Sequence, residues 1–202
     1  MLKRLVLASG NAKKLAEFDR LLAPLGIELM AQAALGVPEA AEPHATFVEN
    51  ALAKARHAAR LTGLAALADD SGLCVDVLGG EPGVQSAYFA GPHKSDQDNN
   101  RKLAAALAPF ERTADRKAHY TAVLVLLRSA DDPEPLIAEG RWHGYVGREP
   151  RGSGGFGYDP WFVDAVSELT GAEMTLEQKN AVSHRSKALR RLVALLRERE
   201  MP

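Results

Sequence analysis

Two adjacent carboxylates, Asp69 and Asp70, are the side chains in this sequence best placed to do chemistry. They follow a short apolar run, residues 64–68, which predicts a buried strand, and the polar residues 69–72 predict a turn. We therefore expect both acids at a strand end, where a sheet holds side chains rigidly and leaves them open to ligands. Two carboxylates this close repel each other unless a cation or a shared proton intervenes. The pair predicts a divalent-metal site, and a plain turn is the alternative interpretation.

A second candidate site lies at the start of the chain, where the predicted strand Arg4–Ala8 leads into the turn Ser9–Asn11 and then a helix. Gly10 allows close approach of a ligand to the backbone, and free amides at a helix N-terminus attract anions. Lys13 and Lys14 add positive charge. The segment predicts a phosphate site, with an ordinary helix cap as the alternative.

An acidic loop precedes the next helix and supplies Glu42, a candidate metal ligand or a solvated loop acid. Thr46 and Glu49 have the spacing of a capping box, which predicts a helix from there to about Thr62. Glu49 is therefore expected to cap the helix rather than to catalyse. Within that helix, Lys54 is a candidate to face an anion.

Glycines at 152, 154, 155 and 157 surround Phe156, Tyr158 and Asp159 in a later loop. An aromatic ring that backbone can closely surround is suited to hold a flat heterocycle. A helix predicted to be capped by Ser183 follows, and cationic candidates gather at its start: Lys179, His184 and Arg185. Such a group suits an anion or a carbonyl, and exposed surface charge is the alternative.

The remaining elements predict an α/β fold with a mixed sheet. Ser95 is expected to cap a helix ending near Leu107, and glycines shape a loop over Gly79–Gly91. The strands predicted at Ala118–Arg128 and Leu136–Trp142 should pair as a hairpin. Hairpins combined with strand–helix–strand units favour a mixed sheet.

Composition limits the class of protein. A chain of 202 residues, 46% of them hydrophobic, is large enough for one domain with a sizeable core, and we expect a single domain over residues 1–202. A formal net charge of −1 disfavours nucleic acid as a partner. The single cysteine, Cys74, and the absence of a leader or spanning segment predict a cytoplasmic protein without membrane association.

Six sequence blocks, in order along the chain, resemble the inosine triphosphate pyrophosphatase (Ham1-like) family. They are Ser9-Gly10-Asn11-Ala12-Lys13-Lys14, Thr46-Phe47-Val48-Glu49-Asn50-Ala51, Asp69-Asp70-Ser71-Gly72-Leu73, Gly79-Gly80-Glu81-Pro82-Gly83, Gly155-Phe156-Gly157-Tyr158-Asp159-Pro160 and Ser183-His184-Arg185. The resemblance implies a long mixed central sheet flanked by helices, two lobes with a cleft, and a homodimer. It also implies hydrolysis of ITP, dITP and XTP to the monophosphate and pyrophosphate, which clears deaminated purines from the nucleotide pool.

The resemblance also implies roles for individual residues. Asp70 would be the proton acceptor and a Mg²⁺ ligand, and Glu42 would be the second Mg²⁺ ligand. From its place beside Asp70, we expect Asp69 to help to hold or polarise this arrangement. Glu39 is an alternative to Glu42, because Pro43 and His44 replace the family's usual Thr-Gly. The residues implied to bind substrate are Ser9, Gly10, Asn11, Ala12, Lys13, Lys14, Ser71, Phe156, Gly157, Tyr158, Asp159, Lys179, His184 and Arg185. We add Lys54 to this set as the candidate of its helix to face an anion.

Three other functions share parts of this pattern. A non-catalytic nucleotide sensor would use the same phosphate and ring sites, although paired acids favour catalysis. A Maf-like pyrophosphatase would act on modified pyrimidine nucleotides instead of purines. A nucleic-acid-binding module would need a basic surface, which the near-neutral charge disfavours.

Overall fold

The computed structural model describes residues 3–10 and 12–200, and within them six strands form one sheet in the order β2-β1-β3-β4-β5-β6. The strands are β1 Arg4–Leu7, β2 Glu28–Ala31, β3 Ala66–Val75, β4 Lys117–Leu127, β5 Leu136–Val146 and β6 Phe162–Asp164. β1 pairs in parallel with both β2 and β3, whereas β5 and β6 are antiparallel. The predicted mixed α/β sheet is confirmed.

The α-helices of the described residues are α1 Ala12–Leu22, α2 Phe47–Thr62, α3 Asp96–Leu107, α4 Leu176–Val182 and α5 His184–Glu200. Helices α2, α3 and α4 begin directly after capping side chains, Thr46, Ser95 and Thr175. The side chains of Thr46 and Ser95 accept hydrogen bonds from backbone amides in the first turns of α2 and α3. Thr175 and Gln178 form a complete capping box at α4, so a backbone donor is satisfied at each of the two positions. No helix in the described part of the chain combines the length and apolarity needed to cross a membrane.

The chain divides into two compact units, in line with the two predicted lobes. The first unit holds residues up to 70, 122–140 and from 187 onward, and the second holds residues 71–121 and 141–186. Strands β3, β4 and β5 contribute residues to both units. The cleft and the single functional domain over residues 1–202 stay predictions.

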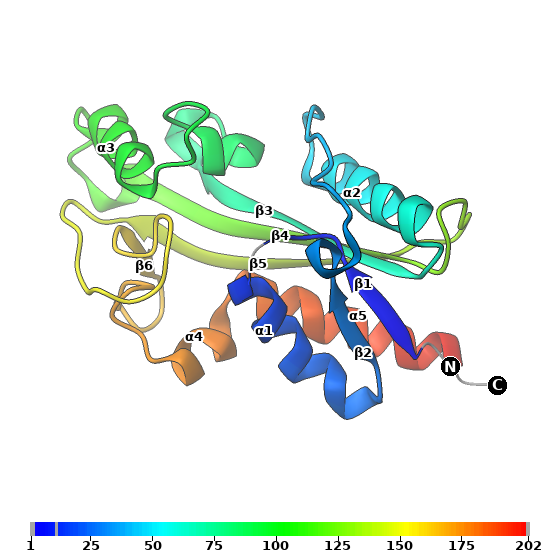
Figure 1. Cartoon of the computed structure of the whole chain (residues 1–202). Helices are drawn as coiled ribbons and strands as arrows, with labels where there is room; N and C mark the ends of the chain where they lie inside the picture. Colours follow the sequence, from blue (N-terminus) through cyan, green and yellow to red (C-terminus); the bar gives the residue numbers. More distant parts are fainter. Residues whose placement is uncertain (1–2, 11, 201–202) are drawn as a thin grey trace. The chain divides into compact units, whose positions relative to one another are not determined.

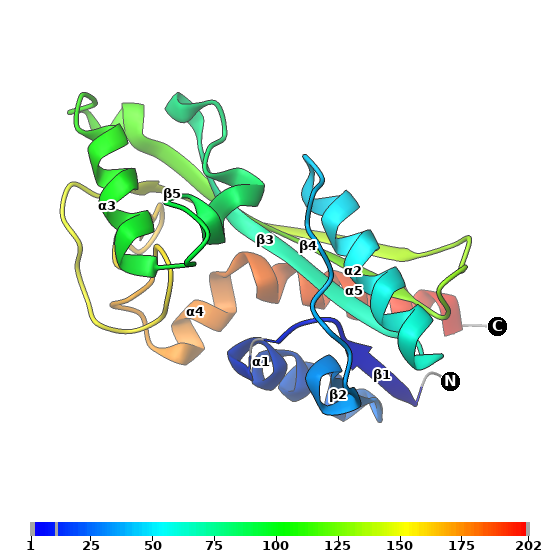
Figure 2. The ribbon, with the colours of Figure 1, turned by 45° about the horizontal axis from the view of Figure 1, so that its top comes forward.

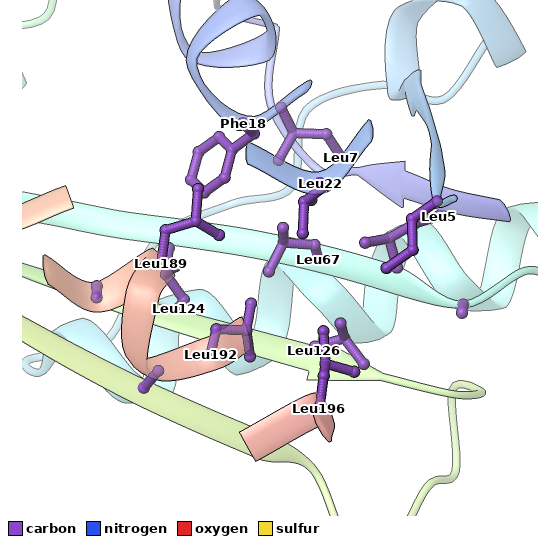
Figure 3. Close-up of a cluster of buried hydrophobic side chains, with 14 of the residues drawn as sticks. Leu5, Leu7, Phe18, Leu22, Leu67, Leu124, Leu126, Leu189, Leu192 and Leu196 are labelled. Carbon is purple, nitrogen blue, oxygen red and sulfur yellow. The ribbon is translucent and has the colours of Figure 1, made fainter. Parts of the chain in front are cut away.

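The first unit buries apolar side chains on both faces of its strands. Helices α1 and α5 cover one face, and α2 covers the other (Figure 1). Leu5 and Leu7 of β1 face α1 and α5, whereas Val6 faces α2, as the period of two in a strand requires. Figure 3 shows the leucine-rich cluster on the first face. Four buried alanines of α2 let that helix lie close to the sheet: Ala51, Ala55, Ala58 and Ala59.

The second unit has an aromatic core. The rings of Tyr120 and Trp142 each meet Phe162 edge to face, with centroids 4.8 Å apart. The indole of Trp142 donates to Asp164 at 2.7 Å, which satisfies its buried N–H. The buried guanidinium of Arg116 donates to four backbone carbonyls, those of residues 107, 110, 146 and 147. Arg116 thereby joins the end of α3 to the end of β5 in this unit.

The turn predicted at residues 69–72 is wrong, because β3 runs unbroken from Ala66 to Val75. Both acids therefore lie inside a strand rather than at its end. The polar residues at 69–72 predicted a turn because Asp and Ser normally stay near solvent or bond to nearby backbone amides. Here distant lysines neutralise Asp69 and Asp70, and this pairing allows two buried carboxylates to remain in a continuous strand.

The connection from β4 to β5 is organised by a buried carboxylate, Asp132. It accepts hydrogen bonds from the backbone N–H and Nε of Arg128 at 2.9 Å and from the backbone N–H of Glu134 at 3.0 Å. The Arg128 side chain, followed by these backbone donors, holds the pKa of Asp132 well below its usual range. The ionised form is thus the one that stabilises the turn.

We expect Asp132→Ala to lower the free energy of unfolding at pH 7 by about 2 kcal/mol, because charge-assisted hydrogen bonds are lost. A depressed folded-state pKa stabilises above the unfolded value of about 3.9. The wild-type advantage should therefore persist at neutral pH and shrink as the pH falls below about 4. Urea unfolding from pH 3 to 8 measures this. Asp131→Ala, at the exposed neighbour, should change stability by less than about 0.5 kcal/mol, and equal losses in both variants would contradict the assignment.

Candidate functional site

Three acids and two lysines form a cluster in the first unit. Lys14 Nζ lies 2.7 Å from Asp69 Oδ2, and Lys54 Nζ lies 2.8 Å from Asp70 Oδ1 and 2.9 Å from Glu42 Oε1. Asp69, Asp70 and Lys54 are at most 9% exposed. The three carboxylates outnumber the two ammonium groups, so the cluster favours a further cation.

The charges of this cluster shift its pKa values in identifiable directions. Burial raises the pKa of Asp70, the attraction of Lys54 opposes that rise, and the neighbouring charges of Glu42 and Asp69 add to it. Burial lowers the pKa of Lys54, but Asp70 and Glu42 outweigh it, and the net shift is upward. The second oxygen of Asp70, Oδ2, is buried and has no hydrogen-bond partner among the described residues. The described protein groups therefore do not use the bonding capacity of this oxygen.

The loop that carries Glu42 is fixed along one face of α2. Residues 50, 54 and 57 are spaced so that all three side chains point to this face. Asn50 accepts from the backbone N–H of His44 at 3.0 Å and donates to its carbonyl at 3.2 Å. The Nε2 of His57 lies 3.1 Å from the carbonyl of Pro38. Figure 2 shows the loop extended beside α2. Glu42 is thus held at Lys54 rather than free in solvent.

The predicted phosphate turn follows β1 and precedes α1, as expected. Ser9 is half-buried and Gly10 is exposed. A Cβ built on Gly10 would lie 2.8 Å from Glu39 Oε1, so the alternative metal ligand Glu39 approaches this turn, while Glu42 approaches Asp70 through Lys54. Asn11 lies outside the described residues. The side chains of Ala12 and Lys13 are likewise outside the description.

The glycine-rich loop of the second unit presents a partly exposed ring. Phe156 is 39% exposed, with Lys179 Nζ 5.3 Å and Arg185 Cζ 5.9 Å from its ring centroid. The buried carboxylate of Asp159 accepts from the backbone N–H of Phe156 at 2.8 Å and forms an ion pair with Lys179. Asp159 therefore holds the aromatic residue of its own loop and a cation of α4, an arrangement suited to a flat ligand with a polar edge.

Other predicted ring-site residues are buried in the second unit. His184 stacks on Tyr120, with ring centroids 4.7 Å apart and planes 9° from parallel. The hydroxyl of Tyr158 donates to the carbonyl of Ser86 at 2.8 Å. Arg185 Nη2 lies 3.4 Å from Ser71 Oγ, so the structure brings these two predicted site residues together. Ligand contact by any of these side chains stays a prediction.

Sequence reasoning missed two residues beside the ring segment, Asp96 and Asn100 of α3. Asp96 Oδ2 accepts from the backbone N–H of Gly157 at 2.7 Å, and Asn100 Nδ2 donates to the Gly157 carbonyl at 2.9 Å. Asp96 carried only the signal of an acid at a helix start, and Asn100 carried none. Contacts spanning about sixty positions leave no local pattern in a single sequence.

Close packing explains why a glycine follows Ser71 in β3. A Cβ built on Gly72 would lie 2.2 Å from the carbonyl oxygen of Gly83 and 2.5 Å from Ser86 Oγ. Ser86 Oγ also accepts from the backbone N–H of Leu73 at 2.9 Å. The strand can meet this segment only where no side chain intervenes.

The chain belongs to the Ham1 family, whose model matches residues 5–195. It is similar to a dITP/XTP pyrophosphatase of Ralstonia nicotianae, with 60% identity covering 97% of this chain and 98% of that protein. It is also 58% identical to a dITP/XTP pyrophosphatase of Nitrosomonas europaea, over 98% of this chain and 97% of the relative. A solved HAM1 protein from Coxiella burnetii is 46% identical, with a TM-score of 0.92 over 98% of this chain and all of that one. The predicted family is confirmed.

We expect Gly72→Ala to destabilise the protein by about 3 kcal/mol, because the added methyl group meets a backbone carbonyl that cannot move aside cheaply. Thermal and urea unfolding measure the loss. Gly147→Ala is the matched control in the same unit, since its Cβ would make ordinary contacts starting at 3.4 Å. A Gly72→Ala protein as stable as the Gly147→Ala protein would show that β3 does not need this close approach.

Proposed function

We propose that this chain hydrolyses ITP, dITP and XTP to the nucleoside monophosphate and pyrophosphate. The observation that carries the proposal is the buried Asp70 carboxylate, which Lys54 holds together with Glu42 and one oxygen of which has no hydrogen-bond partner in the described part of the chain. Relatives with about 60% identity over nearly the full length are dITP/XTP pyrophosphatases, and this supports the same substrate class here.

Asp70 and Glu42 fit a magnesium ion by the chemistry of their donors. Magnesium prefers oxygen ligands and usually keeps several waters or phosphate oxygens, so two protein carboxylates are enough. Within the described residues, no group of three or more His, Cys, Asp or Glu side chains is arranged to hold a metal. Magnesium, when bound, would supply positive charge beside the phosphate oxygens. Lys54 would keep the two carboxylates from repelling each other.

The reaction needs a base and a means of stabilising the leaving group. A water attacks the α-phosphorus, its proton goes to Asp70, and the bond from that phosphorus to the oxygen bridging the β-phosphorus breaks. The electron pair of that bond leaves with pyrophosphate. Lys14, fixed by Asp69, and the backbone at Ser9 and Gly10 would neutralise charge on the departing group. The raised pKa of Asp70 suits a proton acceptor.

Selectivity would come from the edge of the purine. Hypoxanthine and xanthine carry a carbonyl at the position where adenine carries an amino group, and the donors of Lys179, His184 and Arg185 would favour the carbonyl. Adenine would offer these donors an amino group instead of an acceptor, and the lost hydrogen bonds would be costly. The exposed ring of Phe156, flanked by two cations, would support the base.

The base and the triphosphate belong to one substrate molecule, so the residues of both units would act in the same turnover. We propose that residues 1–202 work as one functional domain, which forms a homodimer in the cytoplasm and takes no nucleic acid as partner. Sedimentation of the purified protein tests the dimer.

A panel of purine and pyrimidine triphosphates, with and without Mg²⁺, tests the substrate class by monophosphate and pyrophosphate release. Preference for modified pyrimidines would favour a Maf-like activity instead.

We expect Asp70→Asn to lower kcat for ITP by roughly 10²- to 10⁴-fold at saturating Mg²⁺, because the amide cannot accept the proton. Steady-state pyrophosphate release measures the change. Asp76→Asn, at an exposed carboxylate of η3 (Asp76–Leu78), should retain wild-type turnover. Near-normal turnover by Asp70→Asn, in a protein that melts like wild type, would remove Asp70 from the role of base.

We expect the preference for ITP over ATP, as a ratio of kcat/KM values, to fall by at least about 10-fold in one or more of Lys179→Met, His184→Phe and Arg185→Met. Each change removes a donor while keeping an apolar body of similar length or shape. Competition between the two nucleotides in one reaction measures the ratio directly. A ratio that is unchanged in all three folded variants would rule out this account of selectivity.

A further inference from the structure

We propose that Asp96 and Asn100, on α3, are positioning residues for the base of the substrate, because they hold both polar groups of Gly157 beside the exposed ring of Phe156. This inference rests on the proposed function and adds residues to it. Neither side chain belongs to the six sequence blocks of the family resemblance. Both α3 and the loop belong to the second unit, and they lie side by side in Figures 1 and 2.

Asp96 and Asn100 together bind both backbone polar groups of Gly157, and this pair of contacts is called the α3 clamp below. The backbone N–H of Gly157 donates to Asp96 Oδ2 at 2.7 Å, and its carbonyl accepts from Asn100 Nδ2 at 2.9 Å. Gly157 has a positive φ of 61°, a conformation that glycine adopts at little cost. Because glycine is also free to adopt other conformations, hydrogen bonds from other residues are needed to hold it in this one. The two α3 side chains supply such bonds and select a single conformation.

A second set of hydrogen bonds supports the same arrangement through η4 (Gly83–Tyr88). Asn99, the residue between the clamp positions on α3, donates to the carbonyls of Ser86 and Ala87 at 3.3 and 3.0 Å. The Tyr158 hydroxyl donates to the same Ser86 carbonyl at 2.8 Å. Tyr158 and α3 therefore both donate to the same acceptor, the carbonyl of Ser86.

These bonds restrain the backbone at Phe156 and at the residue that follows it. Asp159 accepts from the N–H of Phe156, and the α3 clamp holds the next residue, so the ring is mounted on a restrained backbone. Ordering one flexible residue costs conformational entropy. With the clamp intact that cost is already met before the base binds, and the benefit should appear as affinity for the base.

A structural role alone would predict something different. Asp98 lies in the same first turn of α3, is exposed, and forms a surface ion pair with Arg101 at 2.9 Å. If Asp96 served only as negative charge at a helix start, then Asp96→Ala and Asp98→Ala would have matching effects. If Asp96 positions the ring, only Asp96→Ala will weaken base binding.

The test compares three full-length variants: Asp96→Ala, Asp96→Asn and Asp98→Ala. We expect Asp96→Ala to raise KM for ITP about 10-fold, the loss typical of one charge-assisted hydrogen bond, with kcat within about 2-fold of wild type. The inhibition constant of IMP should rise similarly, whereas that of tripolyphosphate, which has no base, should not change. Asp96→Asn keeps an acceptor oxygen and should restore most of the affinity. Asp98→Ala should behave as wild type.

A double variant shows whether the effect passes through the ring. Added to Phe156→Ala, the Asp96→Ala change should raise KM no further, because the group that it positions is absent. Additive losses, or a tripolyphosphate constant that rises as much as that of IMP, would overturn the inference. An unchanged KM in Asp96→Ala would also overturn it. A wild-type protein that does not hydrolyse ITP would instead refute the proposed function, and this outcome is distinct from the others.

Discussion

The first unit depends on one electrostatic constraint: buried carboxylates on a continuous strand need compensating charge. An unpaired buried carboxylate costs several kcal/mol, so Asp69 and Asp70 can occupy β3 only because Lys14 and Lys54 reach them from α1 and α2. Lys54 also holds Glu42, and this second contact ties the acidic loop to the strand. The ion pairs thus make possible a strand that carries both acids, and among the residues that the structure describes they leave one oxygen of Asp70 without a hydrogen-bond partner.

Small residues let charged groups come together at this spacing. The alanine face of α2 allows the helix to lie close to the sheet, and the face at residues 50, 54 and 57 is left to bind the loop. At Gly72 the absence of a side chain lets β3 meet the segment around Gly83. In α2 and β3, small residues therefore set how closely the backbones pack, and this packing sets where the neighbouring polar side chains lie.

In the second unit, a single carboxylate has a comparable organising role. Asp159 is buried, accepts from the N–H of Phe156 and pairs with Lys179, so one side chain sets both the ring and a cation that lies near it. Glycines make room for it, because a Cβ on Gly155 or Gly171 would collide with the Asp159 carboxylate. The glycine-rich loop is thus built around a buried acid, while residues 151–156 lie at the surface.

The sequence by itself determined helix starts and the family, because capping spacings and sequence blocks can be recognised from neighbouring residues. Thr175 and Gln178 are three positions apart and cap a helix without help from the rest of the chain. The capping spacing of Thr46 and Glu49 and the six sequence blocks likewise needed no coordinates to interpret. Tertiary structure decided that the acids lie within β3 and that α3 holds Gly157 across 61 positions. Propensity describes an isolated segment, whereas a buried charge or a clamped peptide is stabilised by partners that only the folded chain brings near.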